Sequence, residues 1–297
     1  PYRSGLHIPR DARAEPQRAA PAIAMAAREL GAEIVQHCAV RGIEREAGRI
    51  CGVMTELGYI KTSQVVVAGG AWSRLFLGNM GVDLPQMKIL SSVCRTAPVE
   101  GLPETSAYLG SVAYRKRDDG GYNIAPTMNL SVPIVPDMFR LARLYLPAFK
   151  AEHEMVRPRL DNRFLIELLT PRHWALDTPT VFEKTRVLDP MPDVRLTRRA
   201  VAALQEMFPA ADPIHVLQHW GGLIDAMPDA VPVIDALPTM PGLTIATGFS
   251  GHGFGIGPGA GQLTADLATG RTPVVDPTPF RLSRFTDGTK LSIVGGF

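Results

Sequence analysis

Residues Leu243 to Gly270 read LTIATGFSGHGFGIGPGAGQLTADLATG. The stretch begins as an apolar strand, continues through closely spaced glycines and ends as a helix closed by Gly270, which suits the left-handed residue just past a helix. Pro258 is expected at the first helical position, where its missing N–H is not needed. Because glycines remove side chains from one surface, backbone amides and the positive end of the helix dipole face a ligand there. The stretch predicts a site for a large, negatively charged or electron-rich cofactor.

Two other interpretations of this stretch are weaker. A flexible surface turn is disfavoured by the apolar strand before it and the helix signals after it. The spacing Gly253-x-Gly255-x-x-x-Gly259 imitates a nicotinamide dinucleotide fingerprint. A true fingerprint opens a βαβ unit with a second strand and an acidic residue about 20 positions on. Here little chain follows Gly270, and it is broken by Pro273, Pro277 and Pro279.

Composition indicates an ordinary globular protein. The chain has 297 residues, 45% of them hydrophobic and 20% charged, with a formal net charge of +2. This length predicts about two domains, and this charge favours neither a nucleic-acid nor a membrane-surface partner. No apolar run approaches the roughly 20 residues of a membrane span, and the start lacks a secretory pattern, so a cytoplasmic enzyme is expected. The three cysteines, Cys38, Cys51 and Cys94, are too few and too scattered for a disulfide framework or a metal site.

The first part of the chain predicts one helix followed by short strands. Alanines and apolar residues from Glu15 to Leu30, with Pro16 at the start and Gly31 beyond, predict a helix that Pro21 shortens or bends. An apolar run at 65–68 predicts a buried parallel strand that leads through Gly69 and Gly70 into a short helix, a second place for a ligand to meet backbone. Before it, an antiparallel meander is expected over 33–36, 40–46, 50–55 and 59–62.

The middle of the chain has a different character and predicts a second domain. Strand-like residues 89–96 precede a hairpin over 112–124 that turns at Asp-Asp-Gly-Gly, residues 118–121. Residues 136–155 have helical spacing interrupted by Pro147, which predicts a broken helix. Residues 197–208 predict a helix packed on the core. After Trp220 the chain returns to strand and glycine-loop character, so the first domain is expected to be split in sequence.

An ordered set of motifs resembles the D-amino-acid oxidase and sarcosine oxidase superfamily of flavoenzymes. The resemblance implies an α/β fold with a Rossmann-like FAD-binding domain (residues 1–87 and 221–297) and a mixed-sheet substrate domain (88–220). The family's N-terminal βαβ unit is not among these residues, and the start at Pro1 reads as truncated. An N-terminal fragment or a partner subunit is therefore expected to complete the FAD site. The motifs lie at Gly31–Ile34, Val40–Glu44, Val65–Ser73, Asp118–Gly121, Trp220–Gly222, Pro228–Ile234 and Gly248–Phe254.

The resemblance also implies site residues. Val40 would meet the adenine, and Ala68, Gly69, Gly70 and Trp72 would pass near the ribose and diphosphate. His252 is the predicted catalytic side chain, because imidazole accepts or holds a proton near neutral pH; a histidine bonded to a loop carbonyl is the structural alternative. The residues expected along the flavin are Gly222, Gly253, Phe254, Gly255, Ile256 and Gly257.

The implied function is FAD-dependent oxidation of an amino acid or secondary amine to an imine, by hydride transfer to flavin N5. FAD should be non-covalent, because the attachment cysteine of sarcosine oxidases has no counterpart near Gly222 and Leu223. The alternative is a non-catalytic FAD-carrying or structural subunit of a heteromeric dehydrogenase. Oxygen and a quinone both stay open as the electron acceptor.

Two departures from the family concern the substrate carboxylate. Some relatives place an arginine at the position of Ile224, and sarcosine oxidases place a lysine at the position of Gly255. Both anchors are missing here. A different arginine could bind the substrate carboxylate instead, although each candidate alone is more typical of a solvated surface residue. The candidates are Arg115, Arg117, Arg163 and Arg172.

Overall fold

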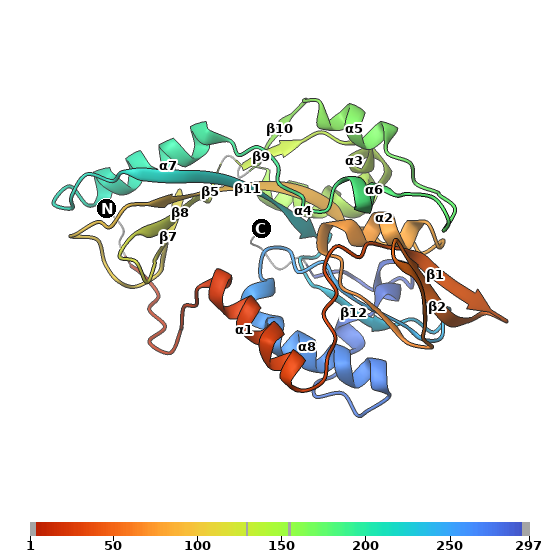
Figure 1. The fold of residues 1–297 in the computed structure, drawn as a ribbon. Coiled ribbons are helices and arrows are strands. Elements are labelled where there is room, and N and C mark those ends of the chain that lie inside the picture. The colour runs from red at the N-terminus through yellow and green to blue at the C-terminus, as the bar shows by residue number, and fades with distance from the viewer. Residues whose placement is uncertain (1–3, 129, 154–155, 293–297) are drawn as a thin grey trace. The chain divides into compact units, whose positions relative to one another are not determined.

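The computed structural model describes residues 4–128, 130–153 and 156–292. They form a mixed α/β structure in which none of the described helices is long and apolar enough to cross a membrane (Figure 1). The helices are α1 (Pro16–Glu29), η1 (Gly70–Trp72), α2 (Ser73–Gly78), α3 (Pro136–Arg140), α4 (Ala142–Glu152), α5 (Arg163–Leu169), α6 (Val181–Lys184), α7 (Val194–Met207), α8 (Gly253–Thr269), η2 (Thr278–Phe280) and η3 (Leu282–Phe285).

The strands form four sheets. Their orders are β1-β2-β3, β10-β9, β11-β5-β8-β7-β6 and β12-β13-β4. The strands are β1 (Val40–Glu46), β2 (Arg49–Thr55), β3 (Gly58–Lys61), β4 (Val65–Val67), β5 (Met87–Thr96), β6 (Ala107–Leu109), β7 (Val112–Lys116), β8 (Tyr122–Pro126), β9 (Leu130–Pro133), β10 (Val156–Arg159), β11 (Val216–Ala226), β12 (Val233–Ala236) and β13 (Leu243–Thr247).

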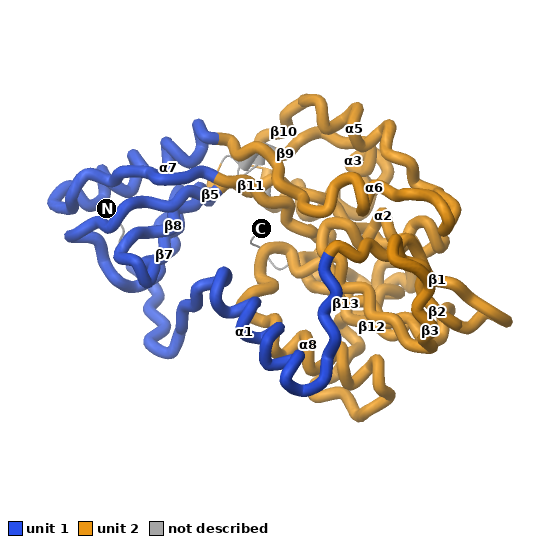
Figure 2. The backbone as a smooth tube through the Cα atoms, in the orientation of Figure 1, with its two compact units in different colours: residues 1–36, 93–127, 194–219 blue, residues 37–92, 128–193, 220–297 orange. Residues whose placement is uncertain are grey.

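The chain divides into two compact units (Figure 2). Unit 1 contains residues 1–36, 93–127 and 194–219, and unit 2 contains residues 37–92, 128–193 and 220–297. This division does not test which segments bind ligands. That residues 88–220 bind substrate and the flanking segments bind FAD therefore stays a prediction.

In unit 1, helix α7 packs against the β7–β8 hairpin. The hairpin is confirmed: its strands are antiparallel, with Lys116 opposite Tyr122, and Gly120 takes a left-handed φ of 82° in the turn. Leu204 of α7 packs in one buried cluster with Tyr122 and residues around it. Helix α1 is confirmed too, and it continues through Pro21 without being shortened.

In unit 2, the antiparallel meander is confirmed for β1, β2 and β3. The fourth strand expected there, at 33–36, is wrong, because these residues are exposed and pair with no neighbouring strand. A strand segment needs a partner for its backbone hydrogen bonds, and turn spacing alone does not supply one.

The sheet β12-β13-β4 is the centre of unit 2. Strand β13 pairs antiparallel with β12 and parallel with β4, and helix α8 packs on all three. Val67, Leu243 and Ile245 are buried in one core cluster. The expected parallel strand at 65–68 is thus confirmed over 65–67. It is not wholly buried, since Val66 is 45% exposed.

The segment 128–193 holds a small helical part and the parallel pair β9–β10. The broken helix at 136–155 is confirmed as α3 and α4, although its last two residues lie outside the described residues. The break falls at Leu141, and α4 passes through Pro147.

Candidate cofactor site

Helix α8 begins at Gly253, so the prediction that Pro258 is its first residue is wrong. A proline here removes only one internal hydrogen bond, the one to the carbonyl of Phe254. Packing of Ala260 and Leu263 against Ile234 fixes the helix further along. The glycines from Gly253 onward therefore form the first turns of the helix rather than a loop before it. The left-handed closure at Gly270 is confirmed, with φ of 69°.

Two parallel strands end beside this helix. Val65 pairs with Leu243 and Val67 with Ile245, so the segments that follow β4 and β13 leave the same edge of the sheet. In open α/β sheets, ligands bind outside the carboxyl ends of the strands. The structure thus brings the predicted segment 68–70 and the predicted start of α8 to one edge.

Hydrogen bonds join these segments to the end of β11. Oδ2 of Asp225 accepts from the Gly248 N–H at 2.7 Å. The Thr247 hydroxyl lies 3.2 Å from the Gly70 carbonyl oxygen and 3.3 Å from Asp225 Oδ2, so it donates to one of them. It also accepts from Nε2 of Gln86 at 3.1 Å. Three segments far apart in sequence are therefore held in register. Sequence reasoning missed Asp225.

The backbone between β13 and α8 follows an unusual path. Gly248, Ser250 and Gly251 all have left-handed φ values, of 76°, 50° and 85°. A Cβ at Gly248 would clash with the side chain of Met227, so only glycine fits there. Two hydrogen bonds offset the backbone strain at Ser250. Its hydroxyl accepts from the Met227 N–H at 3.0 Å and donates to the Gly248 carbonyl at 3.2 Å.

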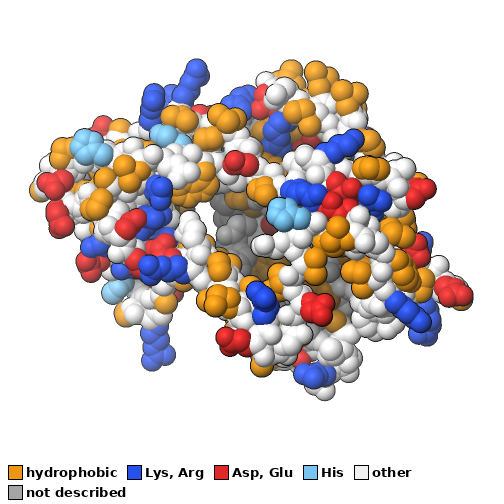
Figure 3. Space-filling view, viewed as in Figure 1, with side chains coloured by type: hydrophobic (Ala, Val, Ile, Leu, Met, Phe, Trp, Pro, Cys, Tyr) orange, Lys and Arg blue, Asp and Glu red, His pale blue; other side chains and the backbone are white. Residues whose placement is uncertain are grey.

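The backbone at the start of α8 is open. A Cβ added at Gly255 or Gly257 meets no atom within 4 Å, whereas Phe254 and Ile256 are 54% and 45% exposed. Exposed hydrophobic side chains occur elsewhere on the molecule (Figure 3), so exposure alone does not mark a site. Here it coincides with open backbone at the positive end of a helix, which suits electron-rich ligand groups.

A buried hydroxyl supports the same assignment. Ser73 is fully buried, and its Oγ has no hydrogen-bond partner among the described residues. A Cβ added at Gly69 would lie 3.3 Å from this Oγ, so the hydroxyl lies next to the glycine segment. An unsatisfied buried polar atom is rare in folded proteins. Together with the open glycine surface, it shows that the residues present fit a bound cofactor.

His252 is the residue directly before α8. Its backbone N–H donates to the Phe249 carbonyl at 2.9 Å, its side chain is exposed, and its imidazole makes no hydrogen bond to another described residue. The alternative in which the ring is bonded to a loop carbonyl is not what the structure shows. The ring is free to meet a ligand, and its catalytic role stays a prediction.

The remaining predicted residues lie in different surroundings. Val40 packs against the core cluster that contains Val67. Gly222 lies within β11, and a Cβ added to it meets no atom within 4 Å. Trp72 ends η1, and its ring meets Phe182 edge to face at 5.3 Å between centroids. All predicted site residues belong to unit 2.

The four arginines considered as carboxylate anchors are all engaged in ion pairs. Arg115 pairs with Glu15 at 2.8 Å, Arg117 with Asp119 at 2.9 Å, Arg163 with Glu167 at 2.9 Å and Arg172 with Asp137 at 2.7 Å. Sequence reasoning passed over Arg95, whose buried Nε has no hydrogen-bond partner among the described residues.

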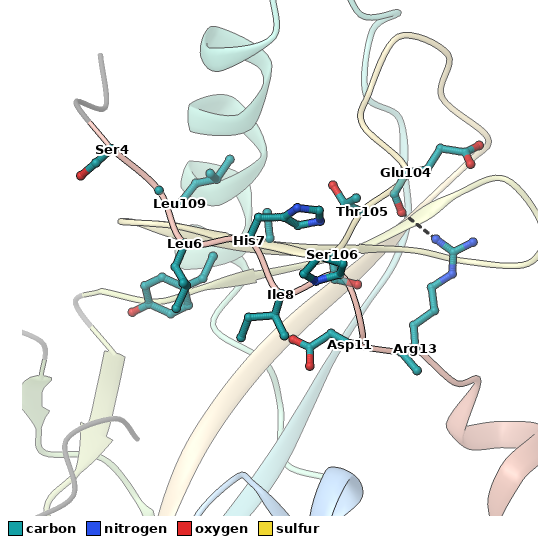
Figure 4. A pocket seen from close by; sticks show the side chains of 15 residues that line it. Ser4, Leu6, His7, Ile8, Asp11, Arg13, Glu104, Thr105, Ser106 and Leu109 are labelled. Atoms are coloured by element: carbon teal, nitrogen blue, oxygen red, sulfur yellow. Dashed lines mark hydrogen bonds between the residues drawn. The ribbon is translucent and has the colours of Figure 1, made fainter.

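A separate hollow of about 980 Å³ lies in unit 1. The N-terminal segment carrying Leu6, His7 and Ile8 runs past residues 104–109, and Nη1 of Arg13 donates to the Glu104 carbonyl at 2.6 Å (Figure 4). None of the predicted site residues lines this hollow.

Known proteins resemble this chain along most of its length. The glycine oxidase of Pseudomonas putida is 26% identical over 246 residues, 82% of this chain and 52% of that protein. The beta subunit of sarcosine oxidase from Arthrobacter is 24% identical over 289 residues, 97% of this chain and 58% of that protein. The chain spans about half the length of these curated relatives.

A solved structure and a family model complete the comparison. The L-amino acid deaminase of Proteus myxofaciens, solved in complex with anthranilate, matches with a TM-score of 0.85 and 35% identity, over 90% of this chain and 60% of that one. The family model of the FAD-dependent oxidoreductases, DAO, matches residues 1–267. Because this model matches nearly the whole length of the chain, the chain belongs to the DAO family of FAD-dependent oxidoreductases.

Proposed function

We propose that this chain carries the flavin-facing and substrate-facing parts of an FAD-dependent oxidase or dehydrogenase of amino acids or secondary amines. The observation that carries the proposal is the convergence of the segments after β4 and β13 with the glycine-rich start of α8. FAD, when bound, accepts the hydride and supplies the redox chemistry. The residues of this chain hold the cofactor, exclude water and position the substrate.

We assign the cofactor contacts as follows. Amides of the first turn of α8, at Gly253 and Gly255, face the electron-rich edge of the flavin ring, where the helix dipole stabilises negative charge, and Gly257 lies further along the ring. Ala68, Gly69 and Gly70 approach the ribose and diphosphate with backbone. Phe254, Ile256 and Gly222 pack along the ring, Val40 lies at the adenine end, and Trp72 supports the diphosphate segment from behind.

His252 is the side chain that we place at the reacting atoms. Its exposed imidazole stands at the start of α8 without a hydrogen bond to another described residue. Neutral imidazole takes up a proton near neutral pH, so it keeps the substrate amine uncharged for oxidation.

The similarity to L-amino acid deaminase favours L-amino acids as substrates. That protein is 35% identical over 90% of this chain. A segment of 62 residues is also 50% identical to N-methyl-L-tryptophan oxidase of Salmonella. One name refers to an L-amino acid and the other to an N-methylated L-amino acid, which agrees with an amine substrate bound beside His252.

A heteromeric arrangement is the second candidate. It is favoured by the match to a sarcosine oxidase beta subunit and by strand β4, which has a partner on one side only among the described strands. A further parallel strand, from another segment or another chain, can pair with the free edge of β4 and complete the FAD site. In this arrangement the chain carries FAD without itself oxidising an amine.

An anaerobic reduction screen tests the proposal. The purified flavoprotein is mixed with L- and D-amino acids, glycine, sarcosine and proline, and the visible absorbance of oxidised flavin is followed. We expect bleaching by at least one L-amino acid and slower bleaching with His252→Asn. Flavin that dithionite bleaches but none of the amines does would favour the non-catalytic subunit instead.

A further inference from the structure

A second cavity lies within unit 2, beneath helices α5 and α6. Its volume is about 340 Å³, within the range of about 300 to 1,000 Å³ that is typical of small-molecule sites. Most of its wall is apolar. The apolar side chains that matter here are Trp72, Leu75, Ile166, Val181, Leu188 and Leu223.

Of the residues predicted for the cofactor site, only Trp72 also lines this cavity. Leu223, which lines it, stands in β11 between Gly222 and Ile224, and successive residues of a strand point to opposite faces. Ile224 approaches Gly251, next to the start of α8. The cavity therefore lies on the other side of β11 from the surface assigned to the cofactor.

In the polar part of this cavity, positively charged side chains outnumber carboxylates. Nζ of Lys88 lies 3.4 Å and Nη2 of Arg163 2.9 Å from the same oxygen, Oε1 of Glu167. All three side chains are less than 20% exposed. Nη1 of Arg163 is buried and has no hydrogen-bond partner among the described residues. One oxygen of Glu167 thus pairs with both cations, while Nη1 of Arg163 has no acceptor. The carboxylate of a bound ligand would supply that acceptor and balance the second positive charge.

The rest of the lining does not reverse this balance. Asp137 is shared by Arg74 at 3.1 Å, Arg172 at 2.7 Å and Arg140 at 3.0 Å, and Arg74 also pairs with the exposed Asp83 at 2.9 Å. Cations outnumber carboxylates among the lining side chains, with Arg74, Lys88, Arg163 and Arg172 against Asp137, Glu167 and Asp189.

The apolar and the cationic parts meet at Trp72. Nζ of Lys88 lies 5.5 Å from the centre of the Trp72 ring, so a ligand that reaches Lys88 also contacts the indole. We propose that this cavity binds a small organic carboxylate with an apolar chain or ring. Its carboxylate lies at Lys88 and Arg163, and its apolar part lies against Trp72 and Leu223.

Calorimetric titration of the purified flavoprotein with octanoate and with 1-octanol tests the charge requirement. Octanoate should bind, and 1-octanol, which has the same chain without the carboxylate, should bind at least about tenfold more weakly. Lys88→Met should weaken octanoate binding by at least about tenfold. Lys61→Met, the same change at an exposed lysine of β3, should leave it unaltered. Equal binding of the two compounds, or equal effects of the two variants, would overturn the proposal.

Two further measurements locate the site. Val181→Phe narrows the apolar part without changing charge, so it should weaken octanoate binding while the thermal midpoint is retained. Octanoate should still bind in the presence of a saturating substrate amine and should leave the flavin spectrum unchanged. Displacement by the amine would place octanoate at the substrate site and would refute a second cavity site. The octanoate titrations of the parent protein and the variants need no substrate amine and have no activity readout, so failure of the proposed amine oxidation does not affect them.

Discussion

Arg284 and Asp229 form a bidentate ion pair, with Nε 2.8 Å from Oδ2 and Nη2 3.1 Å from Oδ1. Both side chains are buried, at 3% and 5% exposure. Nη2 of Arg284 also donates to the Val231 carbonyl at 2.7 Å, and the Val231 N–H donates to Asp229 Oδ1 at 3.2 Å. The pair ties η3 to the connection between β11 and β12.

Arg284→Met should destabilise the protein by about 3–5 kcal/mol, because it leaves the Asp229 carboxylate buried without its partner. Urea denaturation measures the free energy of unfolding. Arg281→Met is the control, since Arg281 pairs with the one-third exposed Asp287 and should contribute less than about 1 kcal/mol. Equal losses in the two variants would show that burial does not strengthen the first pair.

Gly255→Leu should weaken FAD binding by at least about tenfold while the fold is kept. Its side chain enters the surface assigned to the flavin ring, but its Cβ clashes with nothing in the protein. Replacing a helical glycine stabilises the helix by roughly 0.5–1 kcal/mol. Gly261→Leu, on another face of α8 and equally unobstructed, is the matched control. The measurements are FAD titration and thermal denaturation. Equal FAD affinity in both variants would remove α8 from the cofactor site.

FAD should be released completely by acid precipitation. Covalent attachment in sarcosine oxidases needs a cysteine, and none stands near Gly222 and Leu223. The cysteines of the chain are Cys38, Cys51 and Cys94, and Cys94 is buried in the sheet of unit 1. The visible absorbance of the supernatant and of the redissolved pellet shows how much flavin is released and how much stays with the protein. Yellow colour that stays with the denatured protein would contradict it.

Asp137→Asn should lower stability at neutral pH and have a smaller effect in acid. Burial disfavours the Asp137 carboxylate, but the charge of Arg74 and hydrogen bonds from Arg140 and Arg172 outweigh it, so the pKa of Asp137 lies below its ordinary value. A lowered pKa in the folded state stabilises the protein above the unfolded pKa of about 3.9, and this stabilisation is lost as the pH falls through the folded pKa.

Thermal midpoints between pH 7 and pH 3 check this prediction. The gap between Asp137→Asn and the parent protein should narrow below about pH 4. Asp83→Asn is the control, because Asp83 pairs with the same Arg74 at 2.9 Å but is 82% exposed, so it should change the midpoint little at any pH. A constant gap across the range would exclude the carboxylate charge as its cause.

Two of the three thiols should react readily with a disulfide reagent under native conditions at about pH 8. Burial raises the pKa of Cys94 to about 11 and leaves no exposed surface, so its reactive thiolate is scarce and shielded. Cys38 and Cys51 are partly exposed. Cys94→Ala should not change the number of fast-reacting thiols, and a fall in that number would contradict the burial of Cys94.

Elements governed by local chemistry were predictable from the sequence. The β7–β8 hairpin follows from Gly120, which stands where the turn needs a left-handed φ. Helix α1 follows from Pro16, because proline is well tolerated at the start of a helix. The end of α8 at Gly270 follows from the same preference for left-handed glycine. In each case, a few neighbouring residues contain the whole signal.

Features that depend on distant partners were not predictable. Helix α8 starts before Pro258, at Gly253, and its packing on Ile234 joins residues that are distant in the sequence. The contact between Thr247 and Gly70 joins residues 177 positions apart, and that between Asp225 and Gly248 joins residues 23 apart. Neither contact produces a repeating pattern in the sequence from which it could be predicted. The residues of the glycine segment could be named, but the carboxylate and hydroxyl that hold them could not.

One edge of β4 pairs with none of the described strands, and this has a consequence for handling the protein. Its three valines form a β-prone edge without charge or proline, and Val66 is 45% exposed. Natural sheets usually protect such edges, because an open one recruits strands from other molecules. We therefore expect residues 1–297 produced alone to self-associate as concentration rises, and a short peptide that pairs with β4 to suppress this.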